Sequence, residues 1–313
     1  MNKFSVKDFK GVIPASLSIF DKNEELDEKA TKEFIEFLLG FDINGLYLAG
    51  STGEGFLMTD EERKKSVEAV MEVAGDKVPV VVHVGNIGTK KTIELAKHAK
   101  ECGATAISSV PPFYWKFNSE QIAGYYKDIA DAVDMPMIIY NVPLAGAMSK
   151  DLIVELSKID NIKGVKYTNT DIYQIPLIRE EVGKDFMIYG GADELASSNM
   201  LIGVDGIVGS FYNIFPDLFI DIYTSIKNGE ITKAYKLQQD AVRLITPVVG
   251  TGNMVAGIKA LLREAGVNAG YARKPFINFY DEDQKKLAKE IVDLANKHEM
   301  KNIKIIELLR EKY

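Results

Sequence analysis

The segment Val78-Pro79-Val80-Val81-Val82 is apolar at every position and contains four valines. β-Branched residues such as valine favour strands. A strand that is apolar on both faces is typical of a parallel sheet with helices on each side, because only such a sheet is buried on both faces. The segment therefore predicts a buried parallel strand.

Short apolar runs of this kind recur along the chain, and each is followed by an amphipathic stretch. They occupy residues 11–20, 45–50, 78–85, 106–112, 135–141, 162–168, 186–191 and 206–212, with starts 20 to 34 residues apart. Eight repeats of strand and helix predict an α/β protein with a (β/α)8 TIM barrel. A doubly wound open sheet is the structural alternative. No Gly-x-Gly-x-x-Gly follows the first run, which disfavours the nucleotide-binding form of that alternative.

The pattern becomes entirely helical after Pro216, and no linker or low-complexity segment interrupts it. Helical segments are predicted at 217–228, 231–244, 254–264, 282–298 and 302–312, with about three helices beyond the eighth helix of the barrel. We therefore expect residues 1–229 to form the catalytic barrel. Residues 230–313 are expected to form a C-terminal helical extension packed on the barrel within the same domain.

The composition is that of an ordinary soluble globular protein, with 46% hydrophobic and 27% charged residues in 313. A net charge of −7 argues against nucleic acid or an anionic membrane as the main partner. The single cysteine, Cys102, excludes an intrachain disulfide. No signal-peptide pattern and no apolar run of membrane-spanning length are present, so a cytoplasmic location is expected.

The sixth apolar run, Ile162-Lys163-Gly164-Val165-Lys166-Tyr167-Thr168, contains a lysine inside a predicted strand. Side chains alternate across a strand, so Val165 and Tyr167 share one face and Lys166 lies on the other. Burial lowers the pKa of a lysine and leaves a neutral, nucleophilic amine, which is the group that forms Schiff bases with carbonyl substrates. The alternative is a lysine at a strand end with its ammonium in water.

Polar residues cluster where the predicted strands end, which is the edge that carries the active site in barrel enzymes. Ser51 and Thr52 lie in a glycine-rich loop that suits a carboxylate clamp at the start of a helix, or alternatively a simple N-cap loop. Tyr140 ends the fifth run and is a candidate proton carrier or a packing residue. Tyr114 lies in an aromatic patch that is alternatively an apolar contact surface.

No spacing of histidine, cysteine and carboxylate residues indicates a metal site, so no metal is expected. His98 and His298 lie on predicted helices and are interpreted as surface residues.

Six motifs occur together and in order along the chain. In these motifs the chain resembles the pyruvate-dependent class I lyases and synthases, the family of N-acetylneuraminate lyase and dihydrodipicolinate synthase. The resemblance covers about Gly11 to Phe276. The motifs are Gly-Ser-Thr-Gly-Glu at 50–54, Pro-Pro-Phe-Tyr at 111–114, Tyr-Asn-Val-Pro at 140–143, Gly-Val-Lys at 164–166, Gly-Ser-x-Tyr-Asn at 209–213 and Arg-Lys-Pro-Phe at 273–276.

Within the family the chain is more similar to the neuraminate lyase branch. Ser51 stands where synthases commonly have a second threonine, and the segment after the lysine resembles that of the lyases. Ala145 occupies the position of an arginine that binds a substrate carboxylate in synthases, so that charge-assisted contact is missing here. The loop at 143–147 departs from the lyases, because its glycine comes one residue early.

The resemblance implies a Schiff-base aldolase of sialic acid catabolism that cleaves N-acetylneuraminate reversibly to N-acetylmannosamine and pyruvate, with no cofactor beyond the imine on Lys166. It also implies a homotetramer, the assembly of the family. The tyrosine at Tyr114 contacts a neighbouring subunit in related enzymes, which indicates an oligomer. The implied catalytic residues are Lys166, Tyr140, Ser51 and Tyr114, and the implied substrate-binding residues are Ser51, Thr52, Thr168, Gly191, Asp193, Glu194 and Ser210.

Three alternatives remain open at this stage. Two are enzymes of the same family, a 2-keto-3-deoxy sugar acid aldolase and a dihydrodipicolinate synthase. The third is a silent paralogue that binds sugar acids without turnover, and the joint presence of Lys166, Tyr140, Ser51 and Thr52 argues against it.

Overall fold

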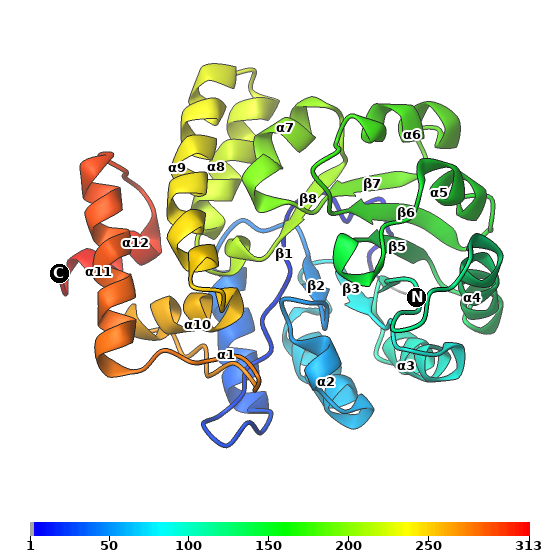
Figure 1. The fold of residues 1–313 in the computed structure, drawn as a ribbon, viewed down its shortest axis with the longest axis horizontal. Coiled ribbons are helices and arrows are strands. Elements are labelled where there is room, and N and C mark those ends of the chain that lie inside the picture. Colours follow the sequence, from blue (N-terminus) through cyan, green and yellow to red (C-terminus); the bar gives the residue numbers. More distant parts are fainter. Residues whose placement is uncertain (1–2) are drawn as a thin grey trace.

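The computed structural model describes residues 3–313 and contains a parallel eight-stranded sheet that curls into a barrel, with helices around it (Figure 1). The hydrogen-bonded order is β1-β8-β7-β6-β5-β4-β3-β2, and a parallel bridge between Ala15 and Tyr47 joins the first strand to the second. The predicted TIM barrel is therefore confirmed. The strands are β1 (Gly11–Pro14), β2 (Leu46–Leu48), β3 (Val80–His83), β4 (Ala106–Ser109), β5 (Met137–Asn141), β6 (Ile162–Tyr167), β7 (Met187–Gly190) and β8 (Gly206–Gly209).

Eight helices connect or follow the strands, one after each, as the alternation predicts. Short 3-10 turns precede several of them at the carboxyl ends of the strands. The helices are α1 (Glu28–Leu39), α2 (Asp60–Ala74), α3 (Thr89–Glu101), α4 (Ser119–Ala132), α5 (Lys150–Leu156), α6 (Gln174–Val182), α7 (Ala196–Leu201) and α8 (Pro216–Lys227), and the 3-10 turns are η1 (Gly55–Leu57), η2 (Pro143–Ala145), η3 (Asp193–Leu195) and η4 (Phe211–Asn213).

Helix α2 shows how the local sequence sets these boundaries. The Thr59 side chain accepts a hydrogen bond from the Glu62 amide, and the Glu62 carboxylate accepts from the Thr59 amide, which forms a capping box. Acidic residues Asp60 and Glu61 in the first turn complement the positive end of the helix dipole. The helix therefore begins one residue after Thr59 and carries the chain back along the outside of the barrel.

Strand β6 divides its side chains between two separate apolar layers. Val165 and Tyr167 pack in the layer between the sheet and the outer helices. Lys166 points the other way, into the barrel, where the apolar layer contains Tyr47 and Tyr140. The alternation predicted for this strand is confirmed. Successive side chains of a strand point to opposite faces, and in a closed barrel one face is the interior and the other faces the outer helices.

Four helices follow α8, one at each of the four segments predicted after 217–228: α9 (Ile231–Gly250), α10 (Met254–Glu264), α11 (Asp281–Lys297) and α12 (Lys304–Arg310). They form a block beside α8 and α1 at one side of the barrel (Figure 1). Among residues 3–313 no single helix is long and apolar enough to cross a membrane. Helices α9 and α10 meet that test only as a pair, and the chain bends by 112° between them.

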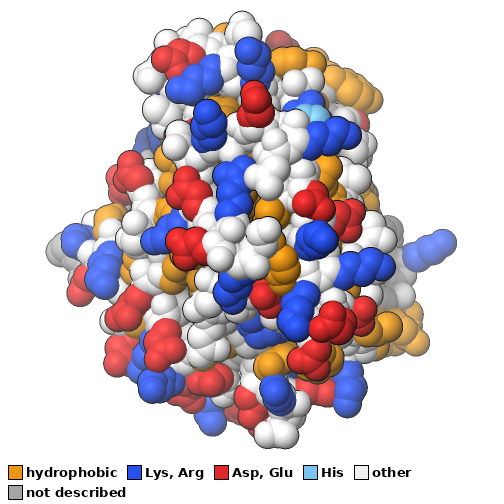
Figure 2. Space-filling model, turned by 90° about the vertical axis from the view of Figure 1, so that its left-hand side faces the viewer, with side chains coloured by type: hydrophobic (Ala, Val, Ile, Leu, Met, Phe, Trp, Pro, Cys, Tyr) orange, Lys and Arg blue, Asp and Glu red, His pale blue; other side chains and the backbone are white. Residues whose placement is uncertain are grey.

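The surface on the side of α11 and α12 carries acidic and basic side chains in alternation, with small apolar areas between them (Figure 2). Neither sign dominates this face, although the whole chain has a net charge of −7. A mixed surface of this kind favours solubility and gives no strong field that would attract a polyanion to this side.

Candidate active site

A cavity of about 420 Å³ opens at the carboxyl ends of the strands. Seven of the ten residues predicted for the site line it, although they come from five different strand-end segments. Because each βα loop of a barrel starts at the same edge, residues distant in sequence meet there. The seven are Ser51, Thr52, Tyr140, Lys166, Thr168, Gly191 and Ser210.

Lys166 lies at the floor of this cavity and is only 4% exposed. Its Nζ atom is 4.3 Å from the ring centroid of Tyr140 and 4.3 Å from that of Tyr47. Tyr140 and Lys166 are direct partners in the pairing of β5 with β6, which fixes the two side chains next to each other. The amine is thus held between two phenol rings at the bottom of a cavity with room for a small substrate.

Tyr47 was missed by the sequence reasoning, which assigned no role to the second strand itself. Its hydroxyl donates to Ser108 Oγ at 3.0 Å, and that hydroxyl donates to the Ile138 carbonyl at 2.8 Å. Burial raises the pKa of Tyr47 well above its usual value, so this ring stays a neutral wall of the lysine site. Alternation in the run 45–50 places Tyr47 on the face opposite Leu46 and Leu48. This alternation was the sequence feature that could have indicated a tyrosine inside the barrel.

The loop with Ser51 and Thr52 contains the groups expected of a carboxylate clamp. Within residues 3–313 the backbone amides of Ser51 and Thr52 have no hydrogen-bond acceptor, whereas the Glu54 amide donates to the Ser51 carbonyl at 3.1 Å. Thr52 Oγ1 lies 2.7 Å from Ser210 Oγ, which links this loop to the end of β8. The loop leads only into the 3-10 turn η1, and Glu54, the residue before it, has a left-handed conformation with φ of 53°. If this loop binds a carboxylate, the amides and hydroxyls are the groups available for it, because no long helix begins directly at the loop.

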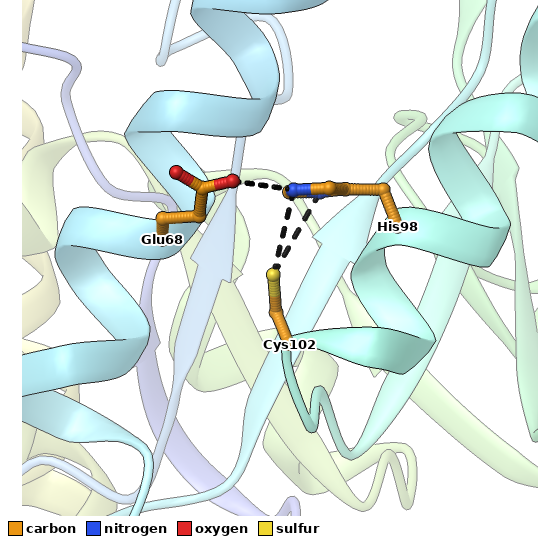
Figure 3. A group of neighbouring side chains, drawn as sticks. All are labelled: Glu68, His98 and Cys102. Carbon is orange, nitrogen blue, oxygen red and sulfur yellow. Dashed lines mark hydrogen bonds and ion pairs between the residues drawn. The ribbon is translucent and has the colours of Figure 1, made fainter.

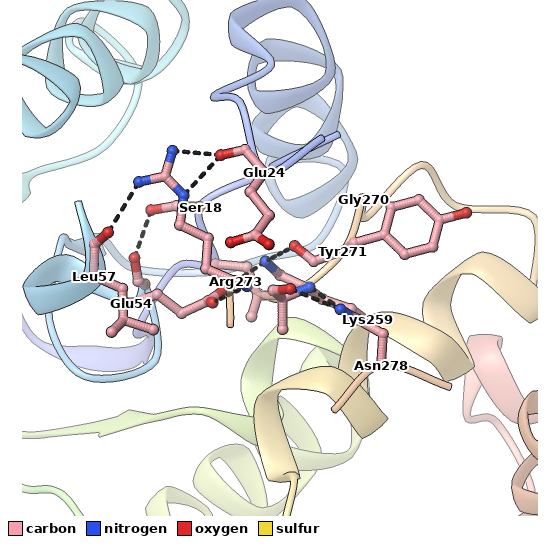
Figure 4. Close-up of polar contacts among 12 residues, drawn as sticks. Ser18, Glu24, Glu54, Leu57, Lys259, Gly270, Tyr271, Arg273 and Asn278 are labelled. Atoms are coloured by element: carbon pink, nitrogen blue, oxygen red, sulfur yellow. Dashed lines mark hydrogen bonds and ion pairs between the residues drawn. The ribbon is translucent and has the colours of Figure 1, made fainter. Parts of the chain in front are cut away.

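A fully buried ion pair lies behind this loop and joins it to the C-terminal helices (Figure 4). Lys259 of α10 donates to Glu54 Oε1 at 2.6 Å and to the Tyr271 carbonyl at 2.8 Å. The Arg273 amide donates to Glu54 Oε2 at 2.7 Å. Burial lowers the pKa of Lys259, and the Glu54 carboxylate opposes that effect. Two motifs far apart in the sequence, Gly-Ser-Thr-Gly-Glu and Arg-Lys-Pro-Phe, therefore meet at one carboxylate.

Arg273 extends the same contacts to the start of α2. Its guanidinium donates to Glu62 Oε2 at 2.8 Å and to the Leu57 carbonyl at 3.0 Å. The hydrogen bond from Arg273 lowers the pKa of Glu62 to about 2. Together with Ser18, whose hydroxyl donates to the Gly53 carbonyl at 2.8 Å, these contacts hold the chain from Gly53 to Leu57.

Asp193 lies beneath the cavity wall and is not part of its lining. Its Oδ2 accepts the Ser210 amide at 3.0 Å and the Phe211 amide at 2.9 Å, so it fixes the backbone at the end of β8. Gln238 of α9 donates to the Asp193 carbonyl at 3.1 Å. Burial raises the pKa of Asp193 to about 7, although the two amides and the charge of Lys166 oppose the shift.

Thr168 and Gly191 sit side by side at the ends of β6 and β7. A Cβ atom at Gly191 would lie 1.8 Å from Thr168 Oγ1 and 3.2 Å from Lys166 Cε, so only glycine fits there. Thr168 Oγ1 is buried and has no hydrogen-bond partner among residues 3–313. A hydroxyl of this kind beside the lysine is free to bind a substrate group.

Two predicted site residues lie apart from the cavity in this chain. Tyr114 is 84% exposed, has a left-handed backbone with φ of 85°, and its ring packs edge-on against Trp115. Glu194 is exposed on η3. The roles assigned to these two residues stay predictions.

The C-terminal helices contribute residues to the cavity that sequence reasoning did not identify. Val249 comes from the end of α9, Gly252 from the turn after it, and Met254 and Val255 from the start of α10. Phe276 comes from the segment after Arg273. These residues are apolar or without a side chain, and no local pattern distinguishes them from ordinary core residues. Only the packing of the extension over the barrel mouth identifies them as part of the site.

Comparison with known proteins places the chain in a family of enzymes. Residues 8–294 match the Dihydrodipicolinate synthetase family. The chain is 36% identical to N-acetylneuraminate lyase 2 of Escherichia coli O6:H1, with 96% of this chain and 99% of that protein covered. It is also similar to the solved structure of a sialic acid aldolase from Ruminococcus gnavus, with 33% identity, a TM-score of 0.87, and coverage of 93% and 99%.

A synthase structure is nearly as similar in fold. A dihydrodipicolinate synthase from Bacillus anthracis has 29% identity and a TM-score of 0.86, with coverage of 91% of this chain and 98% of that one. The fold is thus common to lyases and synthases, and only particular residues in the cavity can separate the two activities. The chain is an enzyme of the Dihydrodipicolinate synthetase family.

Proposed function

We propose that this enzyme is a Schiff-base aldolase that cleaves N-acetylneuraminate reversibly to N-acetylmannosamine and pyruvate. The observation that carries the proposal is the position of Lys166 beside Tyr140 in a cavity of about 420 Å³, below the free amides of Ser51 and Thr52. A nucleophile, a proton carrier and an anion-binding loop are the three groups that cleavage of a 2-keto acid requires. The lyase names of the relatives support the choice of substrate.

The reaction starts with attack of the neutral Lys166 amine on the C2 ketone of the open-chain sugar acid. Loss of water, with a proton supplied by the Tyr140 hydroxyl, gives a protonated imine and leaves Tyr140 as the phenolate. The imine accepts the electron pair of the C3–C4 bond when that bond breaks. The cavity excludes most water around Lys166, which strengthens the charge interactions of the imine.

Tyr140 is the proposed proton carrier. Its phenolate takes the proton of the C4 hydroxyl as the C3–C4 bond breaks, which releases N-acetylmannosamine and leaves an enamine on Lys166. The enamine is then protonated at C3, and hydrolysis of the resulting imine releases pyruvate and restores the amine. The direct pairing of Tyr140 with Lys166 across β5 and β6 keeps the two groups within reach of the same substrate.

The substrate carboxylate is proposed to bind Ser51 and Thr52 through their hydroxyls and amides. Thr52 also contacts Ser210, so the carboxylate site and the far wall of the cavity are coupled. The side of the site proposed to hold the polyhydroxy tail consists of Thr168, Gly191 and Ser210 in the cavity lining, with Asp193 behind Ser210 and Glu194 on the exposed turn η3 as the outer predicted members. A site that hydrogen-bonds hydroxyls rejects shorter analogues, because its own polar groups would then be left unpaired.

A synthase is the second candidate, because the Bacillus anthracis synthase has nearly the same fold. Ala145 argues against it, since the loop at 143–147 then has no arginine to bind a second carboxylate. A 2-keto-3-deoxy sugar acid aldolase would use the same lysine and tyrosine with a shorter substrate.

The experiment that tests the proposal is pyruvate release from N-acetylneuraminate, compared with 2-keto-3-deoxygluconate, without added metal. Condensation of pyruvate with aspartate semialdehyde is measured in parallel. We expect rapid release from the nine-carbon sugar acid. Release from only the shorter acid, or condensation alone, would reject the substrate assignment but leave the lysine chemistry in place.

The role of Lys166 has its own test. Borohydride reduction in the presence of pyruvate should link pyruvate covalently to the wild-type chain, with the expected mass increase. The Lys166→Ala variant should show no adduct, while Lys163→Ala, at an exposed position of the same strand, should react as the wild type does. An adduct that persists in Lys166→Ala would refute the assigned role.

A homotetramer and a cytoplasmic location complete the proposal. The exposed Tyr114 and Trp115 are the surface that such an assembly is expected to cover. Sedimentation velocity of the wild type and of Tyr114→Ala measures the assembly, and a monomer that is fully active would refute the proposed role of Tyr114.

A further inference from the structure

Three potential metal ligands meet on the outer surface of the barrel, between α2 and α3 (Figure 3). Glu68 comes from α2, His98 from α3, and Cys102 is the residue that ends α3. His98 Nε2 lies 2.7 Å from Glu68 Oε1, and Cys102 Sγ lies 3.6 Å and 3.7 Å from the two ring nitrogens of His98. All three ligand atoms lie within 4.8 Å of one another.

We infer that Glu68, His98 and Cys102 form a binding site for a zinc ion. His98 and Cys102 are four residues apart, which puts both on the same face of a helix, and Glu68 faces them from the neighbouring helix. Thiolate, imidazole and carboxylate together are a donor set that selects zinc over magnesium or calcium. Three protein ligands leave a fourth tetrahedral position for water.

Zinc binding would require rotation of the side chains. Figure 3 shows the sulfur against the face of the imidazole ring, and a ring nitrogen binds metals in the plane of the ring. A turn of the His98 ring directs Nε2 toward the sulfur, and the zinc ion takes the place of the hydrogen bond between His98 and Glu68. Bonds of about 2.0–2.3 Å to nitrogen, oxygen and sulfur then replace the present contacts.

The charges around the site favour a dication. The carboxylates of Glu68 and Glu101 lie close enough to interact with the Cys102 thiol. The same carboxylates attract a positive ion. Lys64, which lies on α2 one turn before Glu68, is already paired with Glu61 at 2.7 Å. When zinc binds, the thiol proton is released to solvent, and the thiolate and the Glu68 carboxylate together balance the charge of the ion.

None of the three residues lines the catalytic cavity, so the inferred site is independent of the proposed reaction. Its effect is on the outer layer, because one ion would connect α2 to α3. The spacing of His98 and Cys102 was visible in the sequence, but the third ligand comes from another helix, and one pair of ligands does not define a metal site.

The test is titration of the untagged wild-type protein with cobalt chloride and then with zinc chloride as competitor. Cobalt bound by a thiolate absorbs in the near ultraviolet. We expect one such ion per chain, displaced by one equivalent of zinc. Cys102→Ser should abolish the absorption, and His98→Gln and Glu68→Gln should each weaken binding at least tenfold. His298→Gln is the matched control and should bind as the wild type does.

A second measurement covers variants that bind too weakly for the titration. Zinc should raise the midpoint of thermal unfolding of the wild type and of His298→Gln, because it binds only the folded arrangement of the two helices. It should not raise that of Cys102→Ser. Absorption that survives in Cys102→Ser, a stoichiometry other than one, or an equal thermal shift in wild type and Cys102→Ser would overturn the inference.

Discussion

The buried pair of Lys259 and Glu54 allows a quantitative prediction for Lys259→Met. Both side chains have no exposed area, and their atoms are 2.6 Å apart. Methionine has a similar length but no charge, so the substitution leaves the Glu54 carboxylate buried without its cation and the Tyr271 carbonyl without its donor. Removal of one partner from a buried pair costs about 3–5 kcal/mol of unfolding free energy.

The expected change in the midpoint of thermal unfolding follows from the size of the chain. Unfolding entropy is about 2.1 cal/mol/K per residue, so for 313 residues the predicted loss lowers the midpoint by about 5–8 °C. Lys127→Met is the matched control, because Lys127 pairs with Asp131 on the surface with both side chains 62% exposed. That variant should lose less than about 1 kcal/mol, since exposed ion pairs contribute little.

A double-mutant cycle separates the charge interaction from the loss of packing. In the double variant Glu54→Gln/Lys259→Met no charge of this pair remains buried, and the new glutamine side chain can still accept the Arg273 amide as the carboxylate does. The loss of unfolding free energy in the double variant should therefore be smaller than the sum of the losses in the two single variants, by at least about 2 kcal/mol. Urea unfolding measures all three losses. The affinity for pyruvate should also fall in the single variants, because Glu54 belongs to the loop of Ser51 and Thr52.

In the single variant Glu54→Gln the unfolding free energy should also depend on pH. Without the Glu54 carboxylate the buried Lys259 loses the interactions that oppose desolvation, so its folded pKa falls further below the unfolded value near 10.5. The unfolded chain then binds more protons than the folded chain, and stability rises with pH through the alkaline range.

Two results would refute this account of the pair. One is a midpoint for Lys259→Met within about 2 °C of the wild type, where a decrease of about 5–8 °C is expected. The other is a double variant whose loss equals the sum of the two single losses.

Three further substitutions test the cavity. Tyr140→Phe should lower kcat by about 10²–10⁴-fold while borohydride still traps pyruvate, and loss of trapping as well would mean that the tyrosine does not act mainly in proton transfer. Gly191→Ala should lower kcat/KM by about 10²-fold, because its Cβ would meet Thr168 Oγ1 at 1.8 Å. Gly124→Ala, with open space around it, is the control and should retain full activity. Burial raises the pKa of Asp193 to about 7 in the folded chain, so between about pH 4 and 7 the folded chain binds more protons than the unfolded chain. The unfolding free energy of the wild type should therefore fall as pH rises through this range. Asp193→Asn should remove that decline in urea unfolding, and an unchanged pH profile would contradict the raised pKa.

The sequence by itself determined the barrel and most of the catalytic cavity. Apolar runs such as 78–85 recur at strand–helix spacing, and the closed barrel brings all strand ends to one edge, so the loops after those runs had to meet there. That rule, together with the resemblance, was enough to place Lys166, Tyr140, Ser51 and Thr52 in one cavity. The alternation in β6 decided which face of the strand carries Lys166.

Only the tertiary structure decided which residues support these groups. Tyr47 beside Lys166, Lys259 behind Glu54, and Phe276 in the cavity wall follow from the packing of the C-terminal helices and from the closure of β1 against β2. A buried lysine and a core tyrosine have no local signature, because their environment comes from segments far away in the chain. The meeting of Cys102 with Glu68 has the same origin, since side chains on adjacent helices come together only when both helices pack on the barrel.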